Sequence, residues 1–146
     1  MKRLQTILTI TLTLILLSAC NSEDDIEEIF VGRTWYMNGI VINGTTSSEE
    51  TKHFYNDTDN NCYYIKFSSG TFQGKLSSGV AFSGTWQADG KHQTITLRLK
   101  DRPNADLPFD RQILNILSSV TSYTSGANFM HLNDNNQNTI RFGNIR

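Results

Sequence analysis

The sequence predicts a mostly β (α+β) fold, a small antiparallel, barrel-like meander of about seven or eight strands with one short late helix. Short alternating apolar segments recur along the chain, and turn pairs such as Asn43-Gly44 separate them. Only 2 of the 146 residues are proline, whereas 10 are glycine. One late segment instead has helical periodicity. The length that remains after the N-terminal segment suits a single domain with its own core.

Five strands are predicted before the helix, each bounded by turn residues. Alternation is strictest in the last of them, where Ile95, Leu97 and Leu99 share one face. Thr45–Asn61 is polar and lacks periodicity, so we expect a loop there. The predicted strands are Arg33–Ile42, Tyr63–Ser68, Thr71–Leu76, Val80–Gln87 and Thr94–Lys100.

A single amphipathic helix is predicted late in the chain, and we expect it to cover an open face or end of the sheet. Pro108 suits the first turn of a helix, and Asp110 is favourable there because of the helix dipole. Further strands are predicted around Tyr123, at Phe129–Leu132 and at Thr139–Ile145, with a turn at Asn133–Asn136. The apolar face of the helix comprises Ile113, Leu114, Ile116, Leu117 and Val120.

The N-terminus has the pattern of a secretory signal. Lys2 and Arg3 precede the uncharged segment Leu4–Leu17, which is too short to span a bilayer permanently. Leu17-Ser18-Ala19-Cys20 resembles the lipobox of bacterial lipoproteins, which implies cleavage before Cys20 and a lipid on its sulfur. We therefore expect a signal peptide at 1–19, a lipidated cysteine with an acidic tether at 20–28, and one domain at 29–146. The alternative is an ordinary secretory signal with a chance cysteine at the cleavage site.

An acidic tract follows that cysteine, at Ser22, Glu23, Asp24 and Asp25. It resembles the export tract of Bacteroidetes lipoproteins, and this resemblance implies a lipid-anchored protein of the outer membrane that faces the cell exterior. A solvated spacer is the alternative, because runs of charge usually form solvated segments.

Charge and cysteine content exclude some classes of protein. Removal of Lys2 and Arg3 leaves 11 basic residues against 14 acidic ones, a net charge of −3. The sequence shows no basic stripe, so we expect no nucleic-acid partner. With Cys20 committed to lipid, Cys62 has no cysteine left with which to form an internal disulfide, and we expect it to be a small apolar residue at the start of a strand.

Several short motifs occur in a recognisable order. They are Gly32-x-x-Trp35, Tyr64-Ile65-Lys66-Phe67, Phe72-x-Gly74, Ser83-Gly84-Thr85-Trp86, Thr94-Ile95-Thr96-Leu97, the helical segment through Tyr123, Met130-x-Leu132 and Ile140-Arg141-Phe142. This order resembles the META domain, a small β-rich domain of secreted and lipid-anchored bacterial proteins, over Ile29–Ile145. The resemblance implies a fold but no catalytic residues. Ser77–Ala81 departs from it, because META domains often carry a Gly-Cys-Asn-like stretch there.

A second resemblance lies in Gly32-Arg33-Thr34-Trp35, which is similar to the Gly-x-Trp signature of lipocalins with one residue inserted. Lipocalins hold apolar ligands inside an eight-stranded barrel. This resemblance implies a carrier of a small apolar ligand.

No catalytic residue, cofactor or metal site is predicted. Asp57–Asn61 places oxygen ligands at alternate positions, but Cys62 and Ser68 stand where a calcium loop needs Gly and Glu. The chain has no nucleophile elbow, phosphate-binding loop or dinucleotide fingerprint. The histidines lack the spacing of metal ligands, at His53, His92 and His131.

Aromatic residues offer a further hypothesis, an exposed platform that binds sugars. The alternative is that these side chains belong to the core and its margin, as is common for Trp and Tyr in strands. The residues concerned are Trp35, Tyr36, Tyr55, Tyr63, Tyr64 and Trp86.

We expect a monomeric, non-enzymatic binding or interaction module of the cell envelope. Its partner would be an envelope protein, a glycan or a small apolar ligand, with the loops Thr45–Asn61 and Asp101–Asp110 available for recognition. The alternative function is that of a lipocalin-like carrier. A filled barrel interior would favour the first function, and a hollow one would favour the carrier.

Overall fold

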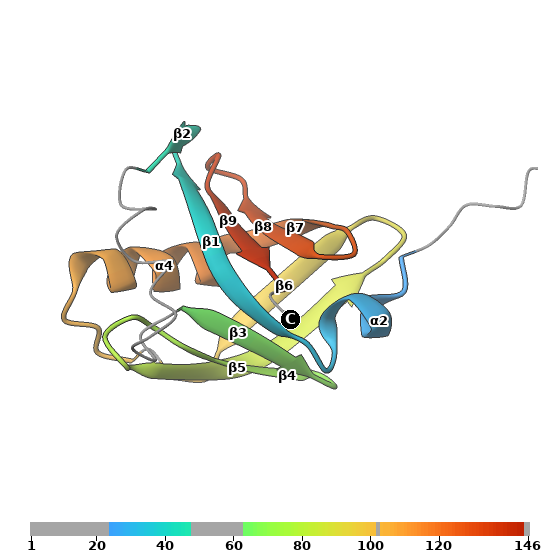
Figure 1. Ribbon diagram of the computed structural model, residues 1–146, viewed down its shortest axis with the longest axis horizontal. Helices are drawn as coiled ribbons and strands as arrows, with labels where there is room; N and C mark the ends of the chain where they lie inside the picture. Colours follow the sequence, from blue (N-terminus) through green and yellow to red (C-terminus); the bar gives the residue numbers. More distant parts are fainter. Residues whose placement is uncertain (1–23, 48–62, 102, 145–146) are drawn as a thin grey trace, which may run out of the picture.

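In a computed structural model, residues 24–47, 63–101 and 103–144 are described, and they form a closed antiparallel barrel with a helix at each end (Figure 1). Helix α2 (Ile26–Phe30) precedes the strands, and α4 (Pro108–Ser119) lies between β6 and β7. The strands are β1 (Thr34–Ile42), β2 (Thr45–Thr46), β3 (Tyr64–Ser68), β4 (Thr71–Lys75), β5 (Ala81–Asp89), β6 (Thr94–Leu99), β7 (Val120–Ser125), β8 (Phe129–Asp134) and β9 (Thr139–Gly143).

The strands follow one another as a meander, and pairing of β9 with β1 closes it. In this closing ladder Ile40 lies opposite Ile140. The short strand β2 adds a hairpin to the end of β1 and lies outside the ring. Of the strand pairs in the ring, β6 and β7 share the fewest paired residues, with Thr94 opposite Ser122 as their single pair. The barrel therefore has eight strands and one extra strand.

The interior is filled by side chains. On β5, for example, Phe82, Gly84 and Trp86 are buried, while Ser83 and Thr85 between them are exposed, which is the alternation of a barrel wall. An eight-stranded barrel is just wide enough for side chains to fill it. The largest fully buried side chains are Trp35, Tyr63, Tyr123, Phe30, Phe67, Phe142, Ile40, Ile65, Leu76, Ile95, Ile113 and Leu117.

Two glycines make room for two of the rings. Across the ladder between β4 and β5, Gly74 lies opposite Phe82 and Gly84 lies opposite Phe72. A Cβ on Gly74 would lie 2.2 Å from Cζ of Phe82, and one on Gly84 would lie 2.1 Å from the carbonyl oxygen of Arg98. Each ring therefore occupies the space that a side chain on the opposite strand would need.

The two helices plug the two ends of the barrel. Helix α4 packs against β6, β8 and β9 and buries an apolar face that includes Leu117. At the other end α2 inserts Phe30, whose ring centroid lies 5.1 Å from that of Phe67 and 5.2 Å from that of Trp86. Phe30 is fully buried, so the shorter helix closes the interior as effectively as the longer one.

The predicted fold class is confirmed, as are the late helix and its start at Pro108. Three local expectations were wrong. Thr45–Thr46, predicted as loop, pairs with the end of β1. Ile26–Glu28, predicted as part of a solvated tether, belongs to α2, because Asp25 accepts the amide hydrogen bond of Glu28 at 3.1 Å and Phe30 enters the core. The predicted turn also begins later, since Asn133 and Asp134 end β8.

The glycine opposite Phe72 gives a testable prediction. Gly84→Ala should lower the free energy of unfolding by about 1–3 kcal/mol, because the added methyl group meets a backbone carbonyl that cannot move aside. Denaturant unfolding measures this, with the exposed neighbour Gln87→Ala as control. Equal stability of the two variants would show that the wall is not closely packed at this position.

Candidate functional site

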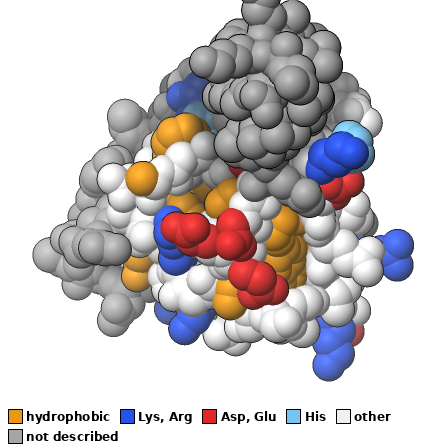
Figure 2. Space-filling view, turned by 90° about the vertical axis from the view of Figure 1, so that its right-hand side faces the viewer, with side chains coloured by type: hydrophobic (Ala, Val, Ile, Leu, Met, Phe, Trp, Pro, Cys, Tyr) orange, Lys and Arg blue, Asp and Glu red, His pale blue; other side chains and the backbone are white. Residues whose placement is uncertain are grey.

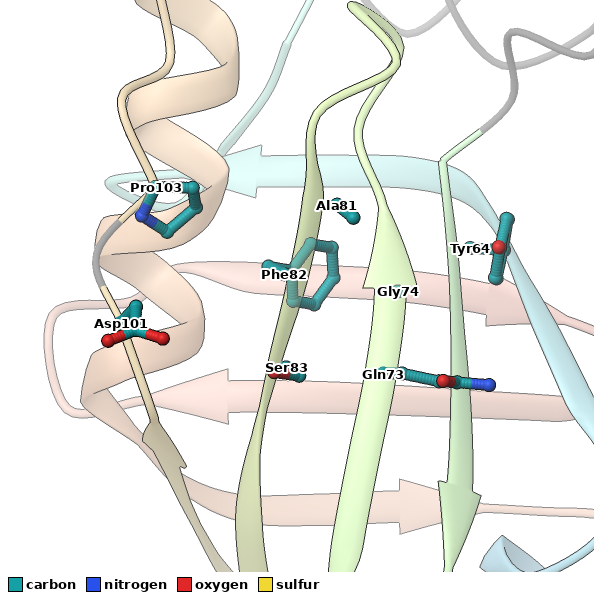
Figure 3. A pocket seen from close by; sticks show the side chains of 8 residues that line it. All are labelled: Tyr64, Gln73, Gly74, Ala81, Phe82, Ser83, Asp101 and Pro103. Atoms are coloured by element: carbon teal, nitrogen blue, oxygen red, sulfur yellow. The ribbon is translucent and has the colours of Figure 1, made fainter.

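The outer wall of the barrel carries a groove of about 280 Å³ over β3, β4 and β5 (Figure 3). Tyr64 and Gln73 lie on one side of it, and Asp101 and Pro103 lie on the other, on the segment that follows β6. Between the two sides the groove is lined by Gly74, Ala81, Phe82 and Ser83. This volume is near the lower end of the roughly 300–1,000 Å³ that is usual for small-ligand sites.

Small residues create this groove. On the outward face of β5, Ala81 has only a methyl group and Ser83 has a short side chain, so the wall is low there. Tyr64 and Pro103 add apolar surface at the two sides, whereas Phe82 is only 6% exposed beneath the groove. Gln73, Ser83 and Asp101 are exposed and supply an amide, a hydroxyl and a carboxylate. The groove thus combines an apolar surface with polar groups around it.

Three lysines surround the groove. Lys66 lies opposite Gln73 in the ladder between β3 and β4, and Lys75 lies opposite both Tyr64 and Ala81. Lys100 donates its backbone N–H to the carbonyl oxygen of Ser83 at 2.9 Å. Each lysine therefore neighbours a residue that lines the groove, and Asp101 is the carboxylate within the lining.

A second hollow of about 460 Å³ continues the first over β4, β5 and β6. The two hollows share Gln73 and Ser83, and the second is also lined by Arg98 and Lys100. On the opposite side of the groove, Tyr36 on β1 lies next to Tyr64, and the two ring centroids are 6.3 Å apart. Both tyrosines lie at half-buried, outward positions. The outer wall therefore carries a continuous polar and aromatic surface.

A buried polar cluster lies where β3, the turn after β4 and α4 meet. Asp110 is fully buried, and the Tyr63 hydroxyl donates to its Oδ1 at 2.5 Å. Ser78 donates to Oδ2 and Ser77 donates to the Tyr63 hydroxyl oxygen at 3.0 Å. Burial, and next the hydrogen bond to Asp110, raise the pKa of Tyr63 far above its ordinary value. The hydroxyl donors satisfy the carboxylate, so the cluster fixes α4 to the barrel.

A wider hollow lies beside α2 at the other end of the barrel, lined in part by Ile26, Trp86 and Ala88. Figure 2 looks onto this end and shows acidic side chains in the middle of the face, with hydrophobic side chains near them. The acidic residues of the first turn of α2 are Glu27 and Glu28. This surface is open and lacks the enclosing sides of the outer-wall groove.

The predicted lipidation and export residues lie on both sides of the point where the described chain begins. Cys20, Ser22 and Glu23 lie outside the described residues. Asp24 accepts hydrogen bonds from the hydroxyl of Tyr123 at 3.0 Å and from Nε2 of Gln93 at 3.2 Å. Asp25 is the N-cap of α2. The second half of the predicted export tract thus also holds the chain to the barrel.

The predicted aromatic platform divides into two groups. Trp35, Tyr63 and Trp86 are buried, so the structure assigns them to the core. Tyr36 and Tyr64 remain on the outer wall. Tyr55 lies outside the described residues. Among the described residues, only Tyr36 and Tyr64 beside the groove therefore remain candidates for an exposed aromatic platform.

The other candidates do not come together. His53, Cys62 and the Asp57–Asn61 segment lie outside the described residues. His92 is exposed and lies 2.6 Å from Asp89, and this contact is the main cause that lowers the pKa of the Asp89 carboxyl. His131 is half-buried beside Phe129, and burial lowers its pKa. Within residues 24–47, 63–101 and 103–144, no three His, Cys, Asp or Glu side chains are grouped to hold a metal ion.

The helices of the described ranges are all too short or too polar to cross a bilayer. Sequence reasoning singled out Tyr64 and the loop Asp101–Asp110, which contributes Asp101 and Pro103 to the groove, but it missed Gln73 and Ser83 as groove residues. The sequence signal for these two residues is weak, because each is marked only by an outward position in its strand, and the two strands belong to different hairpins. It becomes visible once the register between β4 and β5 is known.

The described residues define a class, the small closed antiparallel β-barrel with a filled interior. The chain belongs to the DUF4847 family, a domain of unknown function, whose family model matches residues 21–143. The resemblance to META domains is thus a likeness of short motifs, and the matching family is DUF4847. No protein with a curated description matches the chain significantly.

Solved structures share the fold. A DUF4847 family protein from Bacteroides vulgatus superposes with a TM-score of 0.65 at 22% identity, over 81% of this chain and 96% of that one. A protein from Burkholderia xenovorans gives a TM-score of 0.53 at 18% identity, over 80% of this chain and 83% of that one. At these identities the likeness establishes the fold alone.

The buried tyrosines predict a loss of stability in alkali. Tyr63 and Tyr123 both have a raised pKa, chiefly through burial, so the unfolded chain loses these protons first as the pH rises above about 10. The free energy of unfolding should then fall with pH. Tyr63→Phe should remove about 1.4 kcal/mol from the total loss between pH 9 and 11, most of it above pH 10. Urea unfolding between pH 9 and 11 measures it, and an unchanged slope would contradict the role of Tyr63.

Proposed function

We propose that this chain is a lipid-anchored, non-enzymatic binding module of the bacterial cell envelope that acts as a monomer and faces the cell exterior. The observation that carries the proposal is the contrast between the two surfaces of the barrel wall. The interior is filled and both ends are plugged, whereas the outer wall has a groove with an apolar surface and polar sides. Binding on the outer wall is the activity that this contrast supports.

The filled interior counts against the alternative, a lipocalin-like carrier, although the fold itself is compatible with a lipocalin-like barrel. Phe30 and Leu117 occupy the two ends, and both are at most 1% exposed. A carrier would need an interior cavity of several hundred Å³. Room for an apolar ligand in the interior would require several aromatic side chains to move.

The short distance along the chain between Cys20 and the barrel determines how an anchor would hold the domain. Asp24 is already fixed to Tyr123 and Gln93, and its carbonyl oxygen lies where a Cβ on Gly90 would come within 2.2 Å. Four residues span at most about 14 Å. A lipid on Cys20 would therefore hold the α2 end of the barrel close to the membrane and leave the outer wall accessible.

The anchor has a direct test. Cys20→Ala should release the protein from the membrane fraction of cells, because acyl chains on the sulfur supply the membrane affinity. Fractionation with immunoblotting measures the release, and Cys62→Ala is the matched control that should stay membrane-bound. Equal retention of both variants would end the lipoprotein proposal.

The orientation is tested separately. Replacement of Ser22 and Glu23 by alanine, which leaves Asp24 and Asp25 in place for the fold, should reduce cleavage by protease added to intact cells. Asp25→Asn is the comparison, because asparagine also caps helices while one charge of the tract is lost. Unchanged protease accessibility in the first variant would contradict an export role for Ser22 and Glu23.

The binding function is tested by native mass spectrometry of the full-length protein purified from its own cells in detergent. A stoichiometric added mass that survives mild activation and dissociates on unfolding is the expected result. A bare protein mass, together with no retention of envelope polysaccharide or envelope protein on the immobilised chain, would contradict a binding module.

A further inference from the structure

We propose that the outer-wall groove and the adjoining hollow form a binding site for an acidic oligosaccharide, with a sugar ring at Tyr64. This inference rests on the proposed binding function and adds the class of ligand. Its argument has three parts, which concern the surface that meets the sugar ring, the charge around the groove and the length of the site.

The lining suits a pyranose ring. Such a ring has an apolar C–H face and an edge of hydroxyl groups, so it needs an aromatic or apolar surface beside both hydrogen-bond donors and acceptors. Tyr64 and Pro103, with the methyl group of Ala81, supply the apolar surface. The Gln73 amide and the Ser83 hydroxyl both donate and accept, and the Asp101 carboxylate accepts. The polar groups lie on both sides of the groove (Figure 3).

The charge around the groove selects an acidic sugar. Lys66 and Lys100 are neighbours of lining residues, and Arg98 lines the adjoining hollow. Asp101 offsets one of these charges. A carboxylate or sulfate on the ligand would meet a net positive surface, which strengthens and accelerates association at moderate ionic strength.

The length of the site indicates a chain of sugars. The two hollows share Gln73 and Ser83 and together extend from β3 to β6, so neighbouring sugar units would lie in neighbouring hollows. The Tyr36 ring beside Tyr64 offers a further surface in the opposite direction.

The strand pairing disfavours an extended peptide as ligand. Peptides that add to a sheet need an unpaired strand edge. Here β4 is paired on one side with β3 and on the other with β5, so its backbone groups are already used. Recognition at this wall must therefore use side chains.

The experiment is isothermal titration calorimetry of the full-length protein in detergent with tetragalacturonic acid. The fully methyl-esterified tetramer is the matched neutral probe. The acidic tetramer should bind, and the ester should bind at least tenfold more weakly. The double variant Lys66→Gln/Lys100→Gln should lose at least tenfold in affinity for the acid, whereas Lys91→Gln, on the turn after β5, should keep the affinity of the unchanged protein.

Tyr64→Ala should also abolish binding, and the exposed Gln73→Ala provides a second test if Tyr64→Ala unfolds. No binding of the acidic tetramer, equal binding of the ester, or equal loss in Lys91→Gln would overturn the proposal. Equal binding of an oligothymidylate of similar charge would show that the site accepts any polyanion, and this result would also overturn the proposal. A native ligand that remains bound in Tyr64→Ala would refute this site and leave the proposed function standing.

Discussion

The packing of Phe72 and Phe82 over Gly84 and Gly74 is the constraint on which the barrel wall depends. On each of β4 and β5 a phenylalanine lies opposite a glycine of the other strand. The rings therefore fill the interior without pushing the strands apart. On the outward face of the same two strands, Gln73, Ala81 and Ser83 line the groove.

A second constraint is the buried carboxylate of Asp110. A charge inside a protein is tolerated when hydrogen bonds replace its water, and here Tyr63 and Ser78 supply them to Asp110. These residues come from three separated parts of the chain, so the cluster fixes the position of α4 over its end of the barrel. At the opposite end, Asp24 performs a comparable task with Tyr123. The two acids orient the elements that close the interior.

Much of the fold could be predicted from the sequence, because period-two alternation and turn pairs such as Asn43-Gly44 are local signals. Helix α2 was missed because it is only five residues long and continues the acidic tract that precedes it, and only burial of Phe30 makes it part of the domain. The closing pair of β1 and β9 has no local signal. The groove depends on the register between hairpins, so only Tyr64 and the loop that contains Asp101 and Pro103 were singled out.

Closure by the first and last strands has a consequence for how the chain reaches its folded state. Asn43 and Asn138, which are hydrogen bonded at the end of this ladder, are 95 residues apart in sequence. Contacts this distant form slowly, and a chain that lacks β9 presents one side of β1 as an open strand edge. If the chain crosses a membrane N-terminus first, the barrel can close only after its last strand has emerged. Until then, that edge is the place where two incomplete chains would pair with each other.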